Sequence, residues 1–220
     1  MYPHPRELAG VAVPDSSLAK AATTLAAEAS PTFLFNHCLR TFALGAKAGA
    51  KLGLTYDPEL FYVAALLHDL GLTPKFEAAE RFEVDGADAA RAFCLEHGIP
   101  PERAERVWDA IALHTTVGIA PRNGPEATLV QLGAGTDVFG FGLDVIGRED
   151  VDWVMREAPR DGFSLRFLEL IVDLGRRNPA PHAWTFVSEI GHQFGHDHPC
   201  PTHKQVLPQW NAIVEPESSH

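Results

Sequence analysis

Apolar residues recur along most of this chain at a helical spacing, and Gly and Pro separate one amphipathic segment from the next. Ser30-Pro31 is typical of a helix start, because serine caps the first amides and proline fits the first turn. Gly53 and Gly71 each follow an apolar segment and are typical of helix ends. The pattern predicts helices over residues 16–29, 30–52, 57–71, 85–97, 101–114, 125–139, 148–158, 163–177 and 183–194.

Strand signals are almost absent, because no convincing run of alternating β-branched residues occurs. Gly and Pro cluster at 118–125 and 140–147, which favours loops inside one domain over linkers between two. The chain is therefore predicted to be all-α and to form a single domain over residues 1–220. Its core is expected over about 30–175, with an N-terminal helix and a His-rich C-terminal segment as appendages and irregular ends at 1–14 and 199–220.

The composition is that of an ordinary globular protein. With 45% apolar and 21% charged residues, collagen, a long coiled coil and wholesale disorder are excluded. The longest tight apolar run, residues 60–67, is far shorter than the ~18 residues of a membrane span. The first residues show no basic stretch followed by an apolar one, so no secretory signal is predicted.

The net charge of the chain indicates which kinds of partner it is expected to bind. Eighteen Lys and Arg against 29 Asp and Glu give a net charge of −11, and the basic residues are scattered. Nucleic-acid binding normally needs a basic patch, so neither a nucleic acid nor a membrane is expected as a partner. Three widely spaced cysteines form no disulfide framework, which favours a reducing cytoplasm. The sequence leaves open a homo-oligomer.

His37 lies on an apolar helix face. In the predicted helix it shares that face with Leu34, Thr41 and Leu44, so its ring is expected to point inward. A single histidine on such a face is more often a hydrogen-bonded core residue than a metal ligand. His37 alone is therefore weak evidence for a site.

The pair His68-Asp69 is stronger evidence. The helix over 60–70 is apolar almost all round, so it is expected at the centre of the fold. Two adjacent ionisable groups at its C-terminal end are costly unless they are paired or bind a metal. An aspartate there also adds negative charge at the negative end of the helix dipole, and a divalent cation would offset that charge. The alternative is a His-Asp hydrogen bond at an exposed helix end.

Asp137 completes a set of four. It lies on the predicted 125–139 helix on the same side as Val130 and Ala134, although alone it could equally cap the Gly-rich turn that follows. With His37 and His68-Asp69 it gives two imidazoles and two carboxylates from three helices. Such a set is a plausible first shell for a borderline divalent ion.

The order His … His-Asp … Asp over successive helices resembles the signature of the HD-domain superfamily of metal-dependent hydrolases. Within that superfamily, four segments over roughly residues 30–175 resemble the cyanamide hydratase family. They are Asn-His-Cys-Leu-Arg-Thr-Phe (36–42), Leu-His-Asp-Leu-Gly-Leu (67–72), Arg-Phe-Glu-Val-Asp-Gly-Ala-Asp-Ala-Ala (81–90) and Ile-Ala-Leu-His-Thr-Thr (111–116).

The resemblance implies an HD-type helical bundle with a mononuclear zinc centre in its core that adds water to cyanamide or a similarly small nitrile, giving urea. Carried over by position, the metal ligands would be His37, His68, Asp69 and Asp137. Fe²⁺ would accept the same donors.

Two departures from other HD enzymes favour one metal and a small neutral substrate over two metals and a phosphate. Many HD phosphohydrolases carry a lysine shortly after the His-Asp pair, where this chain has Leu72. Dinuclear members carry a further histidine before a Gly-Ala pair, near the place of Phe82 here. A nucleotide phosphohydrolase remains the alternative enzyme, and a catalytically silent HD module the alternative outside enzymes.

His114 and Thr115 are the remaining candidates for catalysis. His114 shares an inward helix face with Val107 and Ile111, and its place in the fourth segment favours proton transfer or substrate binding over metal ligation. His114, Thr115 or the free oxygen of Asp69 could move the proton. The alternative for His114 is a helix-terminal histidine bonded to a carbonyl.

A second histidine cluster occupies the C-terminal region. Its Gly and Pro residues interrupt any regular scaffold, so a solvated or lid-forming segment is favoured over a structural metal site. The cluster comprises His192, His196, His198, Cys200 and His203.

Overall fold

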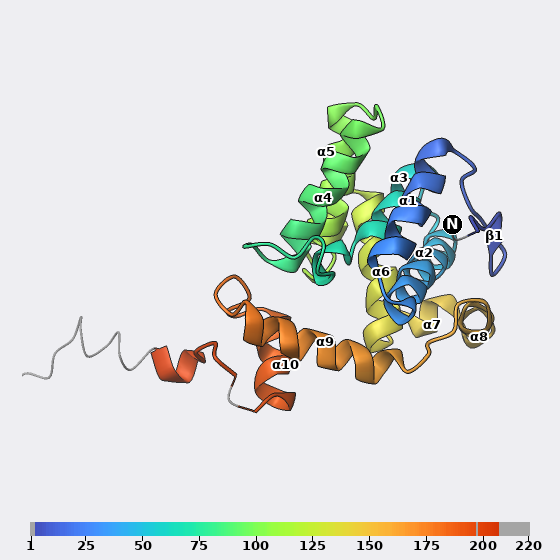
Figure 1. Ribbon diagram of the computed structural model, residues 1–220. Helices are drawn as coiled ribbons and strands as arrows, with labels where there is room; N and C mark the ends of the chain where they lie inside the picture. Colours follow the sequence, from blue (N-terminus) through green and yellow to red (C-terminus); the bar gives the residue numbers. More distant parts are fainter. Residues whose placement is uncertain (1–2, 197, 207–220) are drawn as a thin grey trace, which may run out of the picture. The chain divides into compact units, whose positions relative to one another are not determined.

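The computed structural model of the chain describes residues 3–196 and 198–206, and it confirms the all-α class (Figure 1). The chain divides into two compact units, Met1–Phe167 and Leu168–His220, each of which is described by itself. The single domain over 1–220 stays a prediction. None of the described helices is both long and apolar enough to cross a membrane.

The first unit is built from a short hairpin and a bundle of helices. Its elements are β1 (Glu7–Leu8), β2 (Val11–Ala12), α1 (Ser17–Ala29), α2 (Thr32–Leu52), α3 (Pro58–Leu67), the 3₁₀ turn η1 (Leu70–Leu72), α4 (Phe82–Glu96), α5 (Pro101–Ala112), the 3₁₀ turn η2 (Ala120–Arg122), α6 (Pro125–Phe139), α7 (Leu143–Ile146) and α8 (Arg148–Glu157). The helix α9 (Phe163–Arg177) contributes its first residues to this unit.

Helix α3 is the centre of the bundle, as its apolar sequence predicts. Every residue from Leu60 to Leu67 is buried, and α1, α2, α5 and α6 all pack against it. Asp57 caps its first turn by accepting hydrogen bonds from the amides of Glu59 and Leu60. The residues that follow Leu67, the last residue of this helix, therefore lie in the interior.

Helices α2 and α6 form the most extensive helix pair, and two glycines allow their close approach. A side chain at Gly133 would overlap the carbonyl oxygen of Thr41, and one at Gly45 would overlap the carbonyl oxygen of Leu129. Because the backbones touch here, residue 137, one helical turn after Gly133, faces the second turn of α2.

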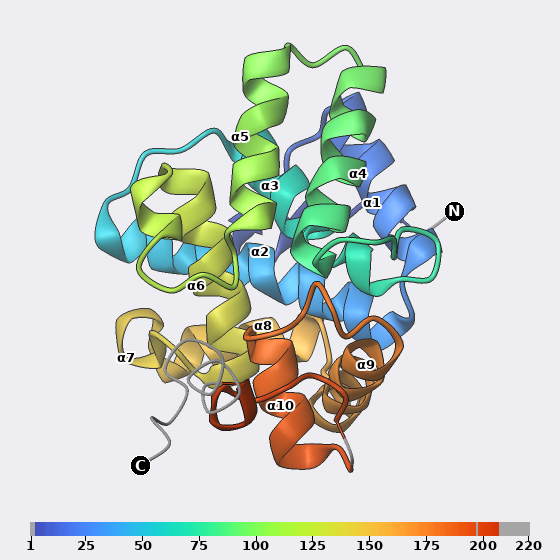
Figure 2. The same ribbon diagram turned by 90° about the vertical axis from the view of Figure 1, so that its left-hand side faces the viewer.

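Helices α4 and α5 stand side by side as an antiparallel pair (Figure 2). The start of α4 packs directly on η1, because Gly71 faces the backbone of Phe82 and of Gly86 without a side chain between them. This contact brings the first turn of α4 next to the segment that follows α3.

Three features of the first unit differ from the sequence prediction. Ser30 ends α1 as its C-cap and does not cap α2, whose N-cap is Pro31 without a side-chain hydrogen bond. The expected irregular N-terminus contains the β1–β2 hairpin, which turns at Ala9 and Gly10 with positive φ. The loop expected at 140–147 contains the short helix α7. Strands of two residues and a helix of one turn are too short to show a periodicity.

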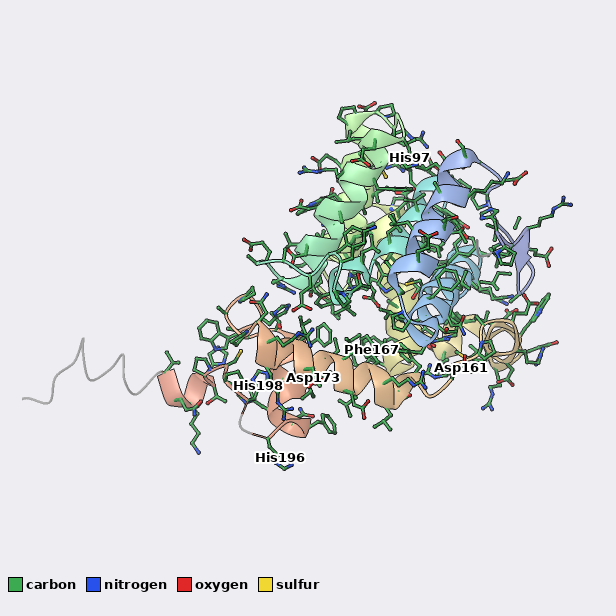
Figure 3. All side chains as sticks on the ribbon, viewed as in Figure 1. His97, Asp161, Phe167, Asp173, His196 and His198 are labelled. Atoms are coloured by element: carbon green, nitrogen blue, oxygen red, sulfur yellow. The ribbon has the colours of Figure 1, made fainter. Side chains whose placement is uncertain are left out.

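The second unit contains the rest of α9 and α10 (Phe186–Phe194). Thr185 caps α10 through a capping box with Ser188. His196 and His198, labelled in Figure 3, follow this helix.

Candidate metal centre

Three side chains converge at the C-terminal end of α3. His68 ends that helix, Asp69 follows it directly, and His37 comes from the second turn of α2. The Nε2 atoms of the two histidines are 3.2 Å apart. The Oδ2 atom of Asp69 lies 3.3 Å from Nε2 of His68 and 3.5 Å from Nε2 of His37. These three residues are the one metal-ligand grouping among the described residues.

The hydrogen bonds on the far side of each ring fix its tautomer. Nδ1 of His68 lies 2.9 Å from the carbonyl oxygen of Ala65, and Nδ1 of His37 lies 2.7 Å from Oδ2 of Asp137. A carbonyl or carboxylate oxygen can only accept, so both Nδ1 atoms carry the hydrogen. In a neutral ring with this Nδ1–H, Nε2 presents its lone pair to the centre, as it does in metal-ligating histidines whose other nitrogen donates to an oxygen.

With both rings neutral, the centre is a group of acceptors without a donor among the described residues. Within the described chain, Oδ2 of Asp69 is buried and has no hydrogen-bond partner. Two lone-pair nitrogens and a carboxylate oxygen repel one another at these distances unless a cation lies between them. In a tetrahedral zinc site with Zn–N bonds of about 2.0–2.1 Å, ligand atoms are separated by about 3.3 Å. The donor set and its spacing therefore fit a divalent metal ion.

The surrounding helices add to this preference for a cation. His68 lies at the C-terminal end of α3, and His114 lies two residues beyond the last residue of α5. The unpaired carbonyls at a helix C-terminus give it a partial negative charge. Both helices thus direct their negative ends towards the cluster.

Burial lowers the basicity of the histidines. Burial is the largest cause that lowers the pKa of His68 to about 3. It is also the largest cause that lowers the pKa of His114 to about 4. Burial also raises the pKa of Asp69. Both histidines are therefore neutral near pH 7, as metal ligation or proton acceptance requires.

Asp137 lies on the opposite side of the His37 ring from His68 and Asp69. Its carboxylate accepts hydrogen bonds from Nδ1 of His37 and from Nε and Nη2 of Arg40, at 2.7–2.8 Å, and from Nη1 of Arg160 at 2.6 Å. In this arrangement Asp137 orients His37 and is directed away from the cluster. Metal ligation by Asp137 stays a prediction, since the structure does not bring it together with His68 and Asp69.

Arg40 and Arg160, which bind the carboxylate of Asp137, were not among the candidate residues that the sequence indicated. The side chain of Arg40 is completely buried and also donates to the carbonyls of Ala158 and Pro159. Burial would raise the pKa of Asp137, but the hydrogen bonds from His37 and Arg40 and the charge of Arg40 outweigh it and hold that pKa well below its usual value. Asp137 is thus an ionised acceptor.

An aromatic wall covers the outer face of His37. Phe163, at the start of α9, stacks on the imidazole with ring centroids 4.7 Å apart, and Phe167 stacks on Phe163. Phe167, which belongs to this wall, and Asp161, two residues before Phe163, are labelled in Figure 3. Of the phenylalanines near the site in sequence, Phe82 places its ring edge-on to His114 at 5.7 Å.

His114 stands at the edge of the cluster. Its Nε2 lies 3.8 Å from Oδ1 of Asp69, and its ring meets that of His68 at 4.9 Å. Nδ1 donates to the carbonyl of Ile111, so Nε2 of His114 also carries a lone pair. Thr115, the next residue, donates its hydroxyl hydrogen to the buried carboxylate of Glu83. His114 is thus the fourth group within reach of the centre.

The C-terminal histidines lie in the second unit and form pairs. The rings of His192 and His198 are 4.9 Å apart, and that of His203 lies 5.7 Å from Trp184. Cys200 donates its thiol hydrogen to the carbonyl of Pro179.

Residues 34–134 match the family model of the HD domain. This stretch contains His37, His68, Asp69 and His114 and ends just before Asp137. The helices that carry the His-His-Asp cluster therefore lie in the part of the chain that matches the HD domain.

The whole chain is also similar to two curated proteins of Saccharomyces cerevisiae, cyanamide hydratase DDI2 and cyanamide hydratase DDI3. Each is 26% identical to it over 212 residues, which cover 90% of this chain and 88% of the relative. Together with the His-His-Asp cluster, these similarities support a metal-dependent enzyme of the HD-domain type.

Proposed function

We propose that the protein is a zinc-dependent hydratase that converts cyanamide to urea, or adds water to a similarly small nitrile-like compound. The observation that carries the proposal is the group of lone-pair nitrogens and the unpartnered oxygen of Asp69. The similarity to two cyanamide hydratases supports the substrate. His37, His68 and Asp69 would hold the ion, with Asp137 as the proposed fourth ligand.

The reaction adds the elements of water across the carbon–nitrogen triple bond. One C–O bond forms, one C–N π bond breaks, and the nitrile nitrogen takes a proton; the resulting isourea moves a second proton from oxygen to nitrogen and becomes urea. A bound zinc ion supplies Lewis acidity, which lets water ionise near neutral pH and offsets negative charge on the nitrile nitrogen.

The protein's own groups move the proton. Nε2 of His114 is unprotonated, because its Nδ1 donates to Ile111, and it lies 3.8 Å from Asp69. It can accept a proton from the attacking water and return it to the nitrile nitrogen. Asp69 and Thr115 are the other candidates for this transfer.

The charges around the site support a small neutral substrate over a phosphate ester. Of the described cations beside the cluster, Arg40 and Arg160 are paired with Asp137, and Arg81 is paired with Glu83. The position that carries a lysine in many phosphohydrolases is occupied by the buried Leu72. No cation of this set is left to bind a phosphate.

Two assays test the proposal. The purified protein is analysed for metal, then incubated with cyanamide and with a panel of nucleotides while urea and phosphate are measured. We expect about one zinc per chain, urea from cyanamide and no phosphate. Two metals per chain, or phosphate release without urea, would overturn it in favour of a phosphohydrolase, and a metal-free, inactive protein would favour a binding module.

We further propose that the protein works in the cytoplasm. Cys38, Cys94 and Cys200 are free and buried, which a reducing compartment favours. Burial raises the pKa of Cys94 to about 11, and that of Cys38 well above its usual value, so neither thiol is a nucleophile near pH 7.

A further inference from the structure

A buried carboxylate lies beside the metal cluster without being part of it. Glu83, in the first turn of α4, has a completely buried side chain. Its Oε1 accepts a hydrogen bond from Nη2 of Arg81 at 2.6 Å and another from Oγ1 of Thr115 at 2.6 Å. The contact of Gly71 with α4 places this turn next to the segment that carries Asp69.

The hydrogen bond to Glu83 fixes the direction of the Thr115 hydroxyl. Burial would raise the pKa of Glu83, but the bond from Arg81, the nearby His114 and the bond from Thr115 outweigh it and lower that pKa. An ionised carboxylate only accepts, so Thr115 gives its single hydroxyl hydrogen to Glu83. The Thr115 oxygen therefore has only lone pairs to offer to any other partner.

We propose that Glu83 is a positioning residue that makes the Thr115 hydroxyl an acceptor for an N–H group of the substrate, so that the site selects nitriles bearing an amino group. This inference rests on the proposed function. In cyanamide the amino nitrogen is bonded to the nitrile carbon. Its N–H groups can donate the hydrogen bond that the Thr115 oxygen can accept. A nitrile without an N–H would leave that oxygen unsatisfied, which costs affinity.

The substrate comparison isolates this effect. Dimethylcyanamide has the same N–C≡N backbone as cyanamide but no N–H group. Glu83→Gln keeps the shape of the side chain, yet its amide can donate to Thr115 and turn the hydroxyl hydrogen outward. Thr115→Val keeps the shape and removes the hydroxyl. Glu96→Gln, exposed at the far end of the same helix, is the matched control.

We expect Glu83→Gln to lower kcat/KM for cyanamide by about 10- to 100-fold, the effect of one hydrogen bond to a charged or fixed partner. The rate on dimethylcyanamide and the zinc content should stay as in the wild type. Thr115→Val should give the same loss, and the double variant should lose no more than either single variant, because the two residues act as one unit. Glu96→Gln should change nothing.

Each contrary result overturns a different statement. An equal loss on both substrates, a loss of zinc or additive losses in the double variant would make Glu83 a merely structural residue and refute the inference while the proposed function stands. A zinc-loaded wild type that forms no urea from cyanamide would refute the proposed function, and the inference with it.

Discussion

Asp137 depends on its cationic partners because it is ionised and buried. Arg40 binds it through two nitrogens, and Arg160 and His37 supply the remaining hydrogen bonds. Removing one member of such a group leaves an uncompensated charge in the interior, which costs far more than the pair contributes. The orientation of His37 therefore depends on a guanidinium that shares the Asp137 carboxylate with it.

Replacing Arg40 should affect both stability and metal binding. We expect Arg40→Ala to lower the free energy of unfolding by about 3–5 kcal/mol and to weaken zinc binding by about 10- to 100-fold. Urea denaturation and chelator competition measure the two effects. Arg156→Ala, at an exposed position on α8, is the control and should change stability by less than about 0.5 kcal/mol. Unchanged zinc affinity in Arg40→Ala would show that His37 is held without Asp137.

His68 and His114 are expected to respond differently to alanine. His68→Ala removes a central ligand, so zinc binding should weaken by more than the ~100-fold of second-shell changes, and activity should be lost with it. His114→Ala should keep zinc and lose about 10²–10⁴-fold in turnover, as for a lost proton-transfer group. Zinc content and urea formation are measured on both variants side by side. Loss of zinc from His114→Ala would make His114 a ligand.

The sequence predicts the residues of the cluster better than their partners. The inward face of α2 and the ionisable pair after an apolar helix point to His37, His68 and Asp69. Arg40 carried a comparable signal, since it lies one turn after His37 on an otherwise apolar helix. Arg160 lies in a connecting segment without periodicity, so its contact with Asp137 depends on tertiary structure alone.

At the scale of elements, glycines decide how closely the helices approach. At Gly133, α6 rests on the backbone of α2, and at Gly71 the start of α4 rests on η1. Glycine in a helix interior costs about 1 kcal/mol relative to alanine. Alanine at position 133 would favour the helix, but only glycine leaves room for the contact with α2. The same contact holds Asp137 opposite His37.

Gly133→Ala tests this contact. The new methyl group would overlap the carbonyl oxygen of Thr41, so the helices must separate, and we expect a net loss of about 1–3 kcal/mol in unfolding free energy. Gly135→Ala, on the same helix, is the control: its methyl meets the half-exposed ring of Phe141 at 3.1 Å, which can move. A Gly133→Ala protein as stable as Gly135→Ala would contradict the close packing.

The helices themselves were predictable because each carries its own periodicity and end signals. The close approaches between helices were not predictable, because a glycine inside a helix shows in the sequence only as a residue of low helix propensity. The β1–β2 hairpin was not predicted for a related reason. Its strands have two residues each, and its turn places Ala9, a residue without turn preference, at positive φ.

For the molecule as a whole, the neutral histidines of the core link stability to pH. In the metal-free protein, His68 and His114 have pKa values of about 3 and about 4, against 6.5 when unfolded. The unfolded chain therefore binds more protons below pH 6.5, and stability falls as the pH falls from there towards 4. The raised pKa of Asp69 acts in the opposite direction, because the folded state then takes up a proton first.

We expect the metal-free protein to be less stable at pH 5 than at pH 7.5, with at most about 2 kcal/mol from each histidine. His114→Asn, whose amide can still donate to Ile111, should remove its share of this difference. His97→Asn, at an exposed position labelled in Figure 3, should not. Urea denaturation at the two pH values measures the effect, and a stability independent of pH would show that the histidines are hydrated.

The hydrogen bonds of the imidazoles also bear on how this site can change in evolution. His68 and His114 are oriented by the main-chain carbonyls of Ala65 and Ile111, each three residues earlier in the same helical turn. Substituting the side chain of Ala65 or Ile111 leaves its carbonyl in place, so these two rings should keep their orientation when neighbouring side chains change. His37 instead relies on a side chain 100 positions away. Mutations that retune the centre should therefore accumulate around Asp137 and its arginines.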